Sequence, residues 1–365
     1  MAQTLPQELV DLILCEFKTD IRSERRFIAQ CGLICRAWLP SSRYRLFADF
    51  ELTDRNVKAL LRIVETSPFP IPTFIRSLAV SSCQEEDGLL EKPFRKLGPL
   101  PQVTTLRVTM DHDVLALNVA LLAQRFANLP HLVLHTCKLP ISAVFDAVSR
   151  FPALKNIGLH WVGFDRDAPP PLRGSRFPSE CNTLSLNLMT SDISAFFKAV
   201  LSLDTIPVFT SLSVYGADPK EGTSLGDYLR HMGDRLHHFC FERSDSVFDD
   251  ACTGALSFST GLRRLDLVVK HAMDVPGIVL RVLIKLHSIH LTAVNVTDTY
   301  GNPNVGRVID ERWQAADKEL AHARFANLRA FTFEVSPEGR ADVSQVPLIS
   351  MPLAQARGIL RISLL

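Results

Sequence analysis

The chain repeats one hydrophobic pattern, apolar-x-x-apolar-x-apolar, between residues 75 and 333. The second apolar residues of the successive copies are Leu78, Leu106, Leu132, Ile157, Leu184, Leu212, Phe239, Leu265, Ile289 and Phe331. The first nine of these positions follow one another at intervals of 24 to 28 residues. This regular spacing predicts a repeat architecture in which every copy forms the same element.

Each copy predicts a short strand, because its last apolar residues alternate with residues of other kinds. Leu132 and Leu134, for example, share one face of the strand, and Val133 and His135 share the other. Several stretches between the copies have the three- and four-residue spacing of amphipathic helices, as in Ile193, Phe196, Phe197, Val200 and Leu201. The pattern therefore predicts an α/β chain, a curved solenoid of strand and helix units with a parallel sheet on its inner face.

The repeats are irregular at several points. Three consecutive prolines at 169–171 predict that residues 165–179 form a loop in place of a helix. The interval from Ile289 to Phe331 is 42 residues, which predicts an insertion near 293–326 that ends in a helix from Asp310 to Phe325. Further strands are predicted around 50–52 and 360–364. Residues 48–365 would then hold about 11–12 irregular repeats.

The first 47 residues lack the strand pattern and predict two short helices. Pro6 suits the start of a helix with an apolar stripe of Leu9, Leu12, Ile13 and Phe17. A second stripe runs through Phe27, Cys31, Ile34, Cys35 and Trp38, and Pro40 is expected to end that helix. A module of this size buries too little surface to be stable alone, so we expect it to pack on the repeats or on a partner.

Composition narrows the classes of partner. Lys and Arg number 40 and Asp and Glu 39, a formal charge of +1 that argues against nucleic acid or an anionic membrane surface as the main partner. No apolar run approaches the roughly 18 residues of a membrane span. The eight cysteines are scattered singly without a CxxC pair. We therefore expect reduced thiols and a cytoplasmic or nuclear location.

Two parts of the sequence resemble known families. The strings LPQELVDLIL and CGLICRAWLPSSRYRLF resemble the F-box, in the form seen in many basidiomycete fungal proteins. The copy Leu129-x-x-Leu132-x-Leu134-x-x-Cys137-x-Leu139 matches the full consensus of a leucine-rich repeat, and the other copies are weaker. The chain thus resembles F-box/leucine-rich-repeat proteins, with an F-box-like module at 1–47 and a repeat solenoid at 48–365.

The resemblance implies a non-catalytic receptor of a SKP/cullin/F-box-type ubiquitin ligase. The F-box of such proteins docks on a SKP-family adaptor, and through it on a cullin, while the repeats hold a protein target. The resemblance places these residues at or under the adaptor interface: Leu5, Pro6, Leu9, Ile13, Ile34, Cys35 and Trp38. The residues leave two alternatives open: the same side chains form only the core of the small module, or the module only caps the first repeat of an interaction solenoid outside the ubiquitin pathway.

The inner face of the sheet is the candidate target-binding surface, because repeat proteins commonly bind partners there. Residues that alternate with the core leucines line it, and the candidates are Arg107, His135, His160, Asn187, Tyr215, Glu242, Asp266 and His290. The alternative for each is an ordinary solvated strand position.

Catalytic and metal motifs are absent from the sequence, so an enzyme is the least favoured class. No GxSxG, HExxH, GxxxxGK[ST] or GxGxxG motif occurs. His131 and His135 have the spacing of a helical ligand pair, but four strand residues would separate them by roughly 13 Å. They could not share a zinc ion, and we expect no metal or cofactor.

Overall fold

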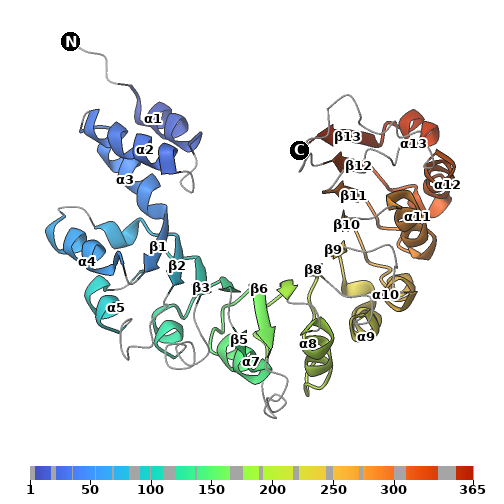
Figure 1. Cartoon of the computed structure of the whole chain (residues 1–365), viewed down its shortest axis with the longest axis horizontal. Helices are drawn as coiled ribbons and strands as arrows, with labels where there is room; N and C mark the ends of the chain where they lie inside the picture. Colours follow the sequence, from blue (N-terminus) through green and yellow to red (C-terminus); the bar gives the residue numbers. More distant parts are fainter. Residues whose placement is uncertain are drawn as a thin grey trace. The chain divides into compact units, whose positions relative to one another are not determined.

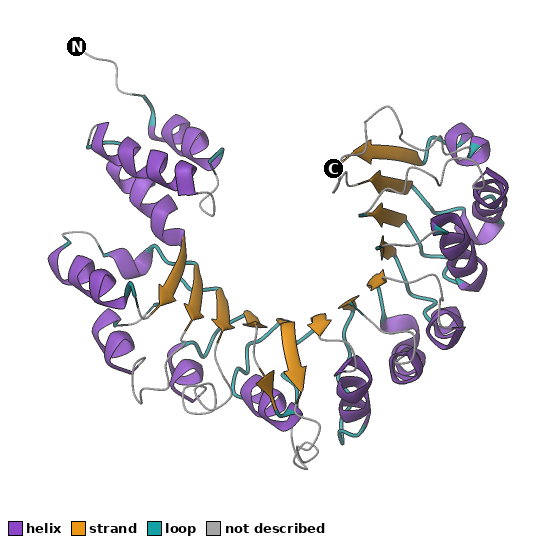
Figure 2. Cartoon of the chain, viewed as in Figure 1, coloured by secondary structure: helices purple, strands orange, loops and turns teal. Residues whose placement is uncertain are grey.

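The structure is a computed structural model that describes residues 5–17, 22–34, 36–53, 55–67, 70–81, 91–98, 100–109, 120–135, 138–164, 176–188, 192–216, 222–243, 250–270, 274–299, 310–335 and 351–364. The chain divides into two compact units, residues 1–158 with 178–180 and residues 159–177 with 181–365. Each unit combines parallel strands with helices that cover one face of the sheet (Figures 1 and 2). The predicted α/β class is confirmed.

The first unit opens with three helices and continues with alternating strands and helices. Its elements are α1 (Gln7–Cys15), α2 (Arg22–Ile34), α3 (Leu39–Ala48), β1 (Asp49–Thr53), α4 (Val57–Thr66), the 3-10 turn η1 (Ile71–Thr73), β2 (Ser77–Ser81), α5 (Glu91–Leu97), β3 (Thr105–Thr109), β4 (His131–His135), β5 (Lys138–Leu139) and α7 (Ile141–Ser149). Strand β6 (Asn156–Phe164) leads from this unit into the second.

The second unit continues the alternation. Its elements are β7 (Thr183–Leu188), α8 (Asp192–Leu201), β8 (Ser211–Tyr215), α9 (Gly222–Met232), η3 (Gly233–Arg235), β9 (His238–Arg243), α10 (Asp250–Ala255), η4 (Leu256–Phe258), β10 (Arg264–Val269), α11 (Val275–Lys285), β11 (Ala293–Asp298), α12 (Asp310–Leu320), η6 (Ala323–Phe325), β12 (Ala330–Val335), α13 (Pro352–Ala356) and β13 (Leu360–Leu364). Each strand from β7 to β12 pairs in parallel with the next strand along the chain.

The core of each unit is a ladder of apolar side chains that lie in register on neighbouring strands. In the first unit Leu78 pairs with Phe50 on one side and with Leu106 on the other. In the second unit the same ladder joins Leu184, Leu212, Phe239 and Leu265, all of them 1% exposed or less. The repeat spacing therefore predicted both the strands and their pairing partners across these intervals.

One of the predicted strands is wrong. The copy at 286–291 was expected to form a strand, but Ile289 lies in a turn and is 57% exposed. Strand β11 lies further along the chain, and its Val294 pairs with Leu265 and with Phe331. The reason is an overlap of two patterns, since Leu291-x-x-Val294-x-Val296 repeats the motif that Leu286-x-x-Ile289-x-Leu291 also carries. The predicted insertion near 293–326 thus includes a strand of the sheet at its start.

The N-terminal helices also differ from the prediction. The second helix ends at Ile34, and a third helix, α3, begins at Leu39 with Pro40 in its first turn. Proline is tolerated there because the first N–H groups of a helix have no intrahelical partner. Pro40 therefore starts a helix where the sequence analysis expected it to end one.

A small core holds the three N-terminal helices together. Val10, Leu14, Ile28 and Cys31 are buried, and Phe17, Trp38 and Leu46 pack against them. The guanidinium of Arg45 donates hydrogen bonds of 3.1–3.3 Å to the carbonyl oxygens of Leu14, Cys15 and Phe17. Arg45 thus satisfies carbonyls at the end of α1 that the helix itself leaves unpaired.

The structure also covers the predicted helix at 310–325 and most of the cysteines. The predicted helix at 310–325 is α12 followed by η6, with Trp313, Ala316 and Leu320 buried. Most of the predicted proline loop, residues 165–175, and residues 300–309 lie outside the described part of the chain. Where the chain is described, its cysteines are free thiols, and none of its helices has both the length and the apolar character needed to cross a bilayer.

Gly261 offers a direct test of how the repeats pack. A Cβ atom at this position would overlap the carbonyl oxygen of Asp234 on the preceding repeat. We predict that Gly261→Ala lowers the free energy of unfolding by about 1–3 kcal/mol, because backbone cannot move aside as a side-chain tip can. The matched control is Gly254→Ala in α10, where a Cβ atom would meet nothing within 4 Å.

The control substitution is expected to be neutral or to stabilise by up to about 1 kcal/mol, since alanine favours a helix over glycine. Urea unfolding followed by tryptophan fluorescence measures both variants, because Trp313 is buried in the second unit. Equal stability of the two variants would contradict this packing of the repeats.

Candidate functional site

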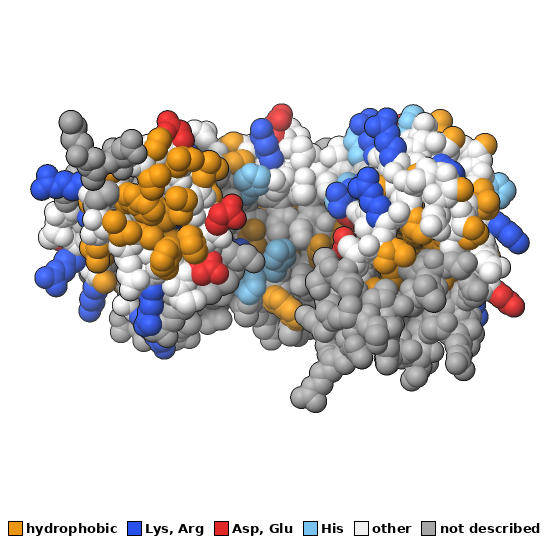
Figure 3. All heavy atoms as spheres, turned by 90° about the horizontal axis from the view of Figure 1, so that it is seen from above, with side chains coloured by type: hydrophobic (Ala, Val, Ile, Leu, Met, Phe, Trp, Pro, Cys, Tyr) orange, Lys and Arg blue, Asp and Glu red, His pale blue; other side chains and the backbone are white. Residues whose placement is uncertain are grey.

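The N-terminal helices expose an unusual number of large apolar side chains. Leu33 and Leu12 are 84% and 64% exposed, and Leu5, Leu9, Ile13, Phe27 and Ile34 are each at least 40% exposed. Figure 3 shows hydrophobic side chains gathered in a patch at the left of the view, where the N-terminal helices lie. Single exposed apolar residues are ordinary, but contiguous patches are typical of interaction surfaces. We refer to these seven residues as the apolar patch.

The residues predicted to meet the adaptor fall into three groups. Leu5, Pro6, Leu9, Ile13 and Ile34 are exposed, while Val10 and Leu14 supply the buried side of α1. Trp38 is half-buried against the core of the helices, and Cys35 lies outside the described residues. Leu12, Leu33 and Phe27 belong to the apolar patch but were missing from the predicted set. Leu12 belongs to the apolar stripe predicted for the first helix, so the spacing already indicated that it shares a face with Leu9 and Ile13.

The helical module joins the first repeat without a linker. Ala48 ends α3 and Asp49 begins β1, and the carbonyl oxygen of Ala48 accepts a 2.9 Å hydrogen bond from the N–H of Arg76. The rings of Tyr44 and Phe74 meet edge to face at 6.4 Å. A mostly apolar cavity of about 480 Å³ lies beside this contact, lined among others by Leu14 and Pro40.

The predicted target-binding residues are distributed over both units. Arg107 on β3 and His135 at the end of β4 lie in the first unit. In the second unit, five of these residues sit on consecutive strands, at positions that alternate with the buried core: His160, Asn187, Tyr215, Glu242 and Asp266. The register places Asn187 directly beside Tyr215.

His290 does not share this surface. The sequence pattern placed it in a strand, but it lies in the exposed turn before β11. The copy of the pattern at 286–291, which located it, does not form a strand. The strand residue that takes its place beside Asp266 is Asn295.

Asp266 is the centre of a hydrogen-bond network on the open face of the second unit. His238 Nε2 lies 2.7 Å from Asp266 Oδ2, and Arg264 Nε donates to both carboxylate oxygens at 3.0 Å. Asn295 Nδ2 donates to Oδ1 at 2.6 Å. Ser211 Oγ lies 3.0 Å from the other ring nitrogen of His238. Side chains from three neighbouring strands, β9, β10 and β11, therefore meet at one carboxylate, and Ser211 on β8 joins the network through His238.

The network changes the acidity of Asp266. Burial alone would raise the pKa of its carboxyl, since the side chain is only 15% exposed. The hydrogen bonds from His238, Arg264 and Asn295 favour the charged form and outweigh burial, so the pKa lies below its ordinary value. Asp266 is thus a charged group that neighbouring groups already satisfy, which limits its use as a ligand contact.

Tyr215 and Glu242 are also engaged within the sheet face. Burial, and then the contact with Cys240, raise the pKa of the Tyr215 hydroxyl, and the Cys240 thiol lies 3.5 Å from that oxygen. Lys270 Nζ forms an ion pair with Glu242 at 2.9 Å. Asp266 and Glu242 therefore carry little unbalanced charge.

His160 lies beside an irregular part of β6. Its Nε2 is 3.3 Å from Ser185 Oγ on the next repeat. Trp161 follows with a φ of 56°, in the left-handed region that L-residues rarely adopt, and its side chain is 55% exposed.

Four members of the Asp266 network were not predicted: Ser211, His238, Arg264 and Asn295. None of the four belongs to a short sequence motif. Aligning the repeats by their core residues Leu212, Phe239 and Leu265 would have placed Ser211, His238 and Arg264 in one row. The spacing therefore held a signal for these residues that the search for short motifs missed.

The network contains a Ser–His–Asp chain, an arrangement used in nucleophilic catalysis. Its surroundings do not fit that chemistry. The N–H of Ser211 already donates to the carbonyl oxygen of Asn182 at 3.0 Å, so it is not available to stabilise an oxyanion. The cavity beside Tyr44 and a second cavity between α8 and α9 are lined by other residues.

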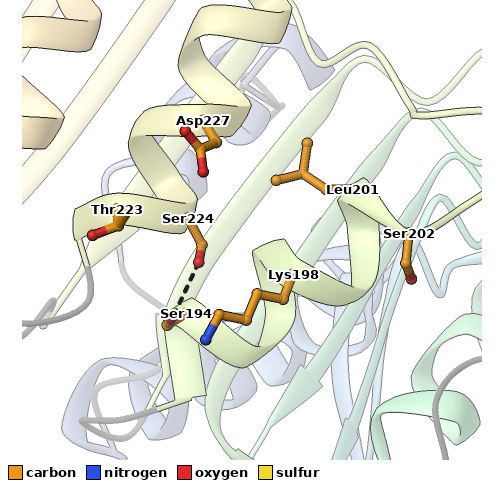
Figure 4. Close-up of a pocket in the computed structure, with 7 residues that line it drawn as sticks. All are labelled: Ser194, Lys198, Leu201, Ser202, Thr223, Ser224 and Asp227. Atoms are coloured by element: carbon orange, nitrogen blue, oxygen red, sulfur yellow. Dashed lines mark hydrogen bonds between the residues drawn. The ribbon is translucent and has the colours of Figure 1, made fainter.

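A second cavity, of about 580 Å³, lies between α8 and α9 (Figure 4). Ser194 and Ser224 are joined across it by a 3.1 Å hydrogen bond, and Lys198 and Asp227 also line it. A lysine and an aspartate at one opening give no net charge. Across the residues that the structure describes, no group of three or more His, Cys, Asp or Glu side chains is arranged to hold a metal ion.

Comparisons with known proteins add no identification. No model of a protein family matches the chain, and no curated protein matches it.

We predict that Asp266→Asn destabilises the second unit by about 1–3 kcal/mol at neutral pH, because it removes a charge that three donors satisfy. A carboxyl whose pKa is lowered in the folded state stabilises the fold at neutral pH, and that contribution disappears as pH falls through the folded pKa. The difference between wild type and variant should therefore shrink on acidification. Urea unfolding at a series of pH values measures it.

Glu334→Gln is the control, because Glu334 accepts a single 3.3 Å hydrogen bond from Thr297 on the same face. Its effect should stay within about 0.5 kcal/mol. A constant difference between wild type and Asp266→Asn at every pH would contradict the assignment of a lowered pKa.

Proposed function

We propose that the chain is the substrate-recognition subunit of a SKP/cullin/F-box-type ubiquitin ligase. The helical module would dock on a SKP-family adaptor, and the leucine-rich-repeat-like units would hold a protein target. The observation that carries the proposal is the apolar patch on α1 and α2, which coincides with residues of the F-box-like signature.

The apolar patch supports docking for an energetic reason. Full burial of an exposed leucine or isoleucine side chain is worth about 1.5–3 kcal/mol, and Leu9 and Ile13, which are 44% and 40% exposed, can contribute part of that to an association. Leu9 and Ile13 lie one helical turn apart on α1, while Val10 and Leu14 already serve the core. The helix therefore has enough buried side chains for folding and keeps a second apolar face for a partner.

The join between the helices and the first repeat supports a receptor role. Because α3 passes directly into β1, a protein bound to the helices is held at a fixed position relative to the first repeats. A ubiquitin ligase of this type works by proximity, since it raises the effective concentration of a target near a charged enzyme. On this proposal the chain itself performs no bond chemistry.

A second candidate function is a protein-interaction solenoid outside the ubiquitin pathway, in which the helices only cap the first repeat. The contacts of α3 favour it, because Tyr44 packs on Phe74 and Arg43 Nη1 donates to Ser67 Oγ at 3.4 Å. These contacts cover the start of the first unit. They do not use the exposed faces of α1 and α2, so the two candidates can be separated by experiment.

The adaptor interface is tested by Leu9→Asp combined with Ile13→Asp in the full chain. We expect capture by a recombinant SKP-family adaptor to fall at least tenfold, because binding would bury two aspartate charges in an apolar contact. The matched control is Ile284→Asp with Leu353→Asp, whose side chains are 46% and 43% exposed, against 44% and 40% for Leu9 and Ile13.

The control variant should keep full adaptor capture, and thermal melting should show that both variants remain folded. Failure of the wild-type chain to bind the adaptor, or equal capture by the two double variants, would reject the proposed function.

Deletion of residues 1–48 separates the two candidate functions further. If the helices serve the adaptor, the remaining repeats should lose some stability through exposure of Phe50 and Phe74, and adaptor capture should vanish. If the helices are only a cap, the deletion should greatly destabilise the repeats while the full chain never binds the adaptor. Circular dichroism melts of the full chain and the deletion variant, together with the adaptor assay, decide between these results.

A further inference from the structure

The turns that precede β9, β10, β11 and β12 form one continuous edge of the second unit. The N–H of Arg263 donates to the carbonyl oxygen of His237, that of Thr292 to Arg263, and that of Arg329 to Thr292, at 2.8–2.9 Å. The buried Ser288 hydroxyl donates to the carbonyl oxygens of Thr260 and Leu262, and Asn327 Nδ2 donates to that of Ile289. These bonds tie each turn to its neighbour. We call residues 233–237, 258–264, 287–292 and 326–330 the turn edge.

The turn edge concentrates positive charge on a nearly neutral chain. Its four arginines are Arg235, Arg263, Arg264 and Arg329, against a single acidic residue, Asp234. His237, His287 and His290 lie on the same turns. Figure 3 shows blue and pale-blue side chains gathered along one side of the second unit, at the upper right of the view. The whole chain has a formal charge of only +1, so this local excess is not a general property of the surface.

Two of the four arginines are committed to the fold. Arg264 binds Asp266, and Arg235 donates to the carbonyl oxygens of His231 and Met232 at the end of α9. Arg263 and Arg329 are exposed, and the described part of the chain provides no carboxylate within ion-pair distance of either. They lie two strands apart, which corresponds to about 10 Å at the usual strand spacing.

Exposed apolar side chains lie on the same turns. Phe258 is 53% exposed on the turn before β10, and Ile289 is 57% exposed on the turn before β11. The turn that the sequence analysis mistook for a strand is therefore the one that presents Ile289 and His290 to solvent. Two exposed cations and two exposed apolar side chains on one edge are the components of a peptide-binding surface.

We propose that the turn edge binds an acidic segment of a target protein, in which every third residue is Asp or Glu and apolar side chains lie between them. Charge complementarity identifies the partner, because the guanidinium groups of Arg263 and Arg329 meet no carboxylate among the residues that the structure describes. A peptide in the polyproline II conformation advances about 3.1 Å per residue and presents every third side chain on one face, so carboxylates three residues apart lie about 9 Å apart and reach both arginines. The apolar residues between them contact Phe258 and Ile289.

The composition of the edge favours a peptide over nucleic acid. Single-stranded nucleic acid is bound by several stacked aromatic side chains along a longer basic track. Phe258 is the one aromatic side chain among the exposed large hydrophobics of these turns. The inference rests on the proposed function only in assigning the peptide to a ubiquitination target, since the edge binds the peptide with or without the adaptor.

The test uses a fluorescein-labelled peptide of twelve residues, Asp-Leu-Ser repeated four times, and a matched peptide with Asn in place of Asp. Fluorescence anisotropy with the full chain should show at least tenfold tighter binding of the Asp peptide, weakened by added salt. Arg263→Glu combined with Arg329→Glu should reduce binding at least tenfold. Lys198→Glu with Lys318→Glu, an equal charge change on the outer helices α8 and α12, should leave binding unchanged.

Three results would overturn the inference: no preference for Asp over Asn, equal binding by the two charge-reversed variants, or tighter binding of a twelve-nucleotide polyuridine RNA that the arginine variant abolishes. Leu9→Asp with Ile13→Asp should keep peptide binding, and the arginine variant should keep adaptor capture. A failure of the proposed function is thereby distinguished from a failure of this surface.

Discussion

The structure depends on one constraint: the core side chain of each strand must meet its counterpart at the same height on the next strand. Leu184, Leu212, Phe239 and Leu265 satisfy it, and burial of these side chains is the main force that holds the second unit together. A single repeat cannot bury its own ladder, so stability is shared among neighbours. The same register places the residues between the core positions in rows on the open face, and the Asp266 network follows from it.

The spacing of the core residues made the fold largely predictable from the sequence. Strands, pairing partners and the parallel direction followed because the same interval recurs and each strand is joined to the next through a helix or turn. The prediction failed where the local pattern was ambiguous. Leu291 fits two overlapping copies of the pattern, and only the pairing of Val294 with Phe331 shows which copy forms the strand. Pro40 failed for a related reason, because proline suits both the end of one helix and the first turn of the next.

The candidate sites were less predictable than the fold. Periodicity identified Leu9 and Ile13 as one stripe, but it could not say whether the stripe faces the core or the solvent until Val10 and Leu14 were seen to fill the core. The turn edge carries no repeat pattern of its own. Arg263 and Arg329 lie on the same edge only because turns that are far apart in the sequence pack beside one another. A short sequence motif does not record this arrangement. The two surfaces differ in chemistry, since one is apolar and the other combines cations with apolar side chains.

The central claim is that the exposed faces of α1 and α2 are an adaptor interface and not a by-product of a small core. Hydrogen exchange of the full chain with and without a SKP-family adaptor tests it most directly. The account predicts that the adaptor slows exchange of amides within residues 5–34 and leaves residues 258–264 and 287–292 unchanged. Unchanged exchange in residues 5–34 in the presence of saturating adaptor would contradict it.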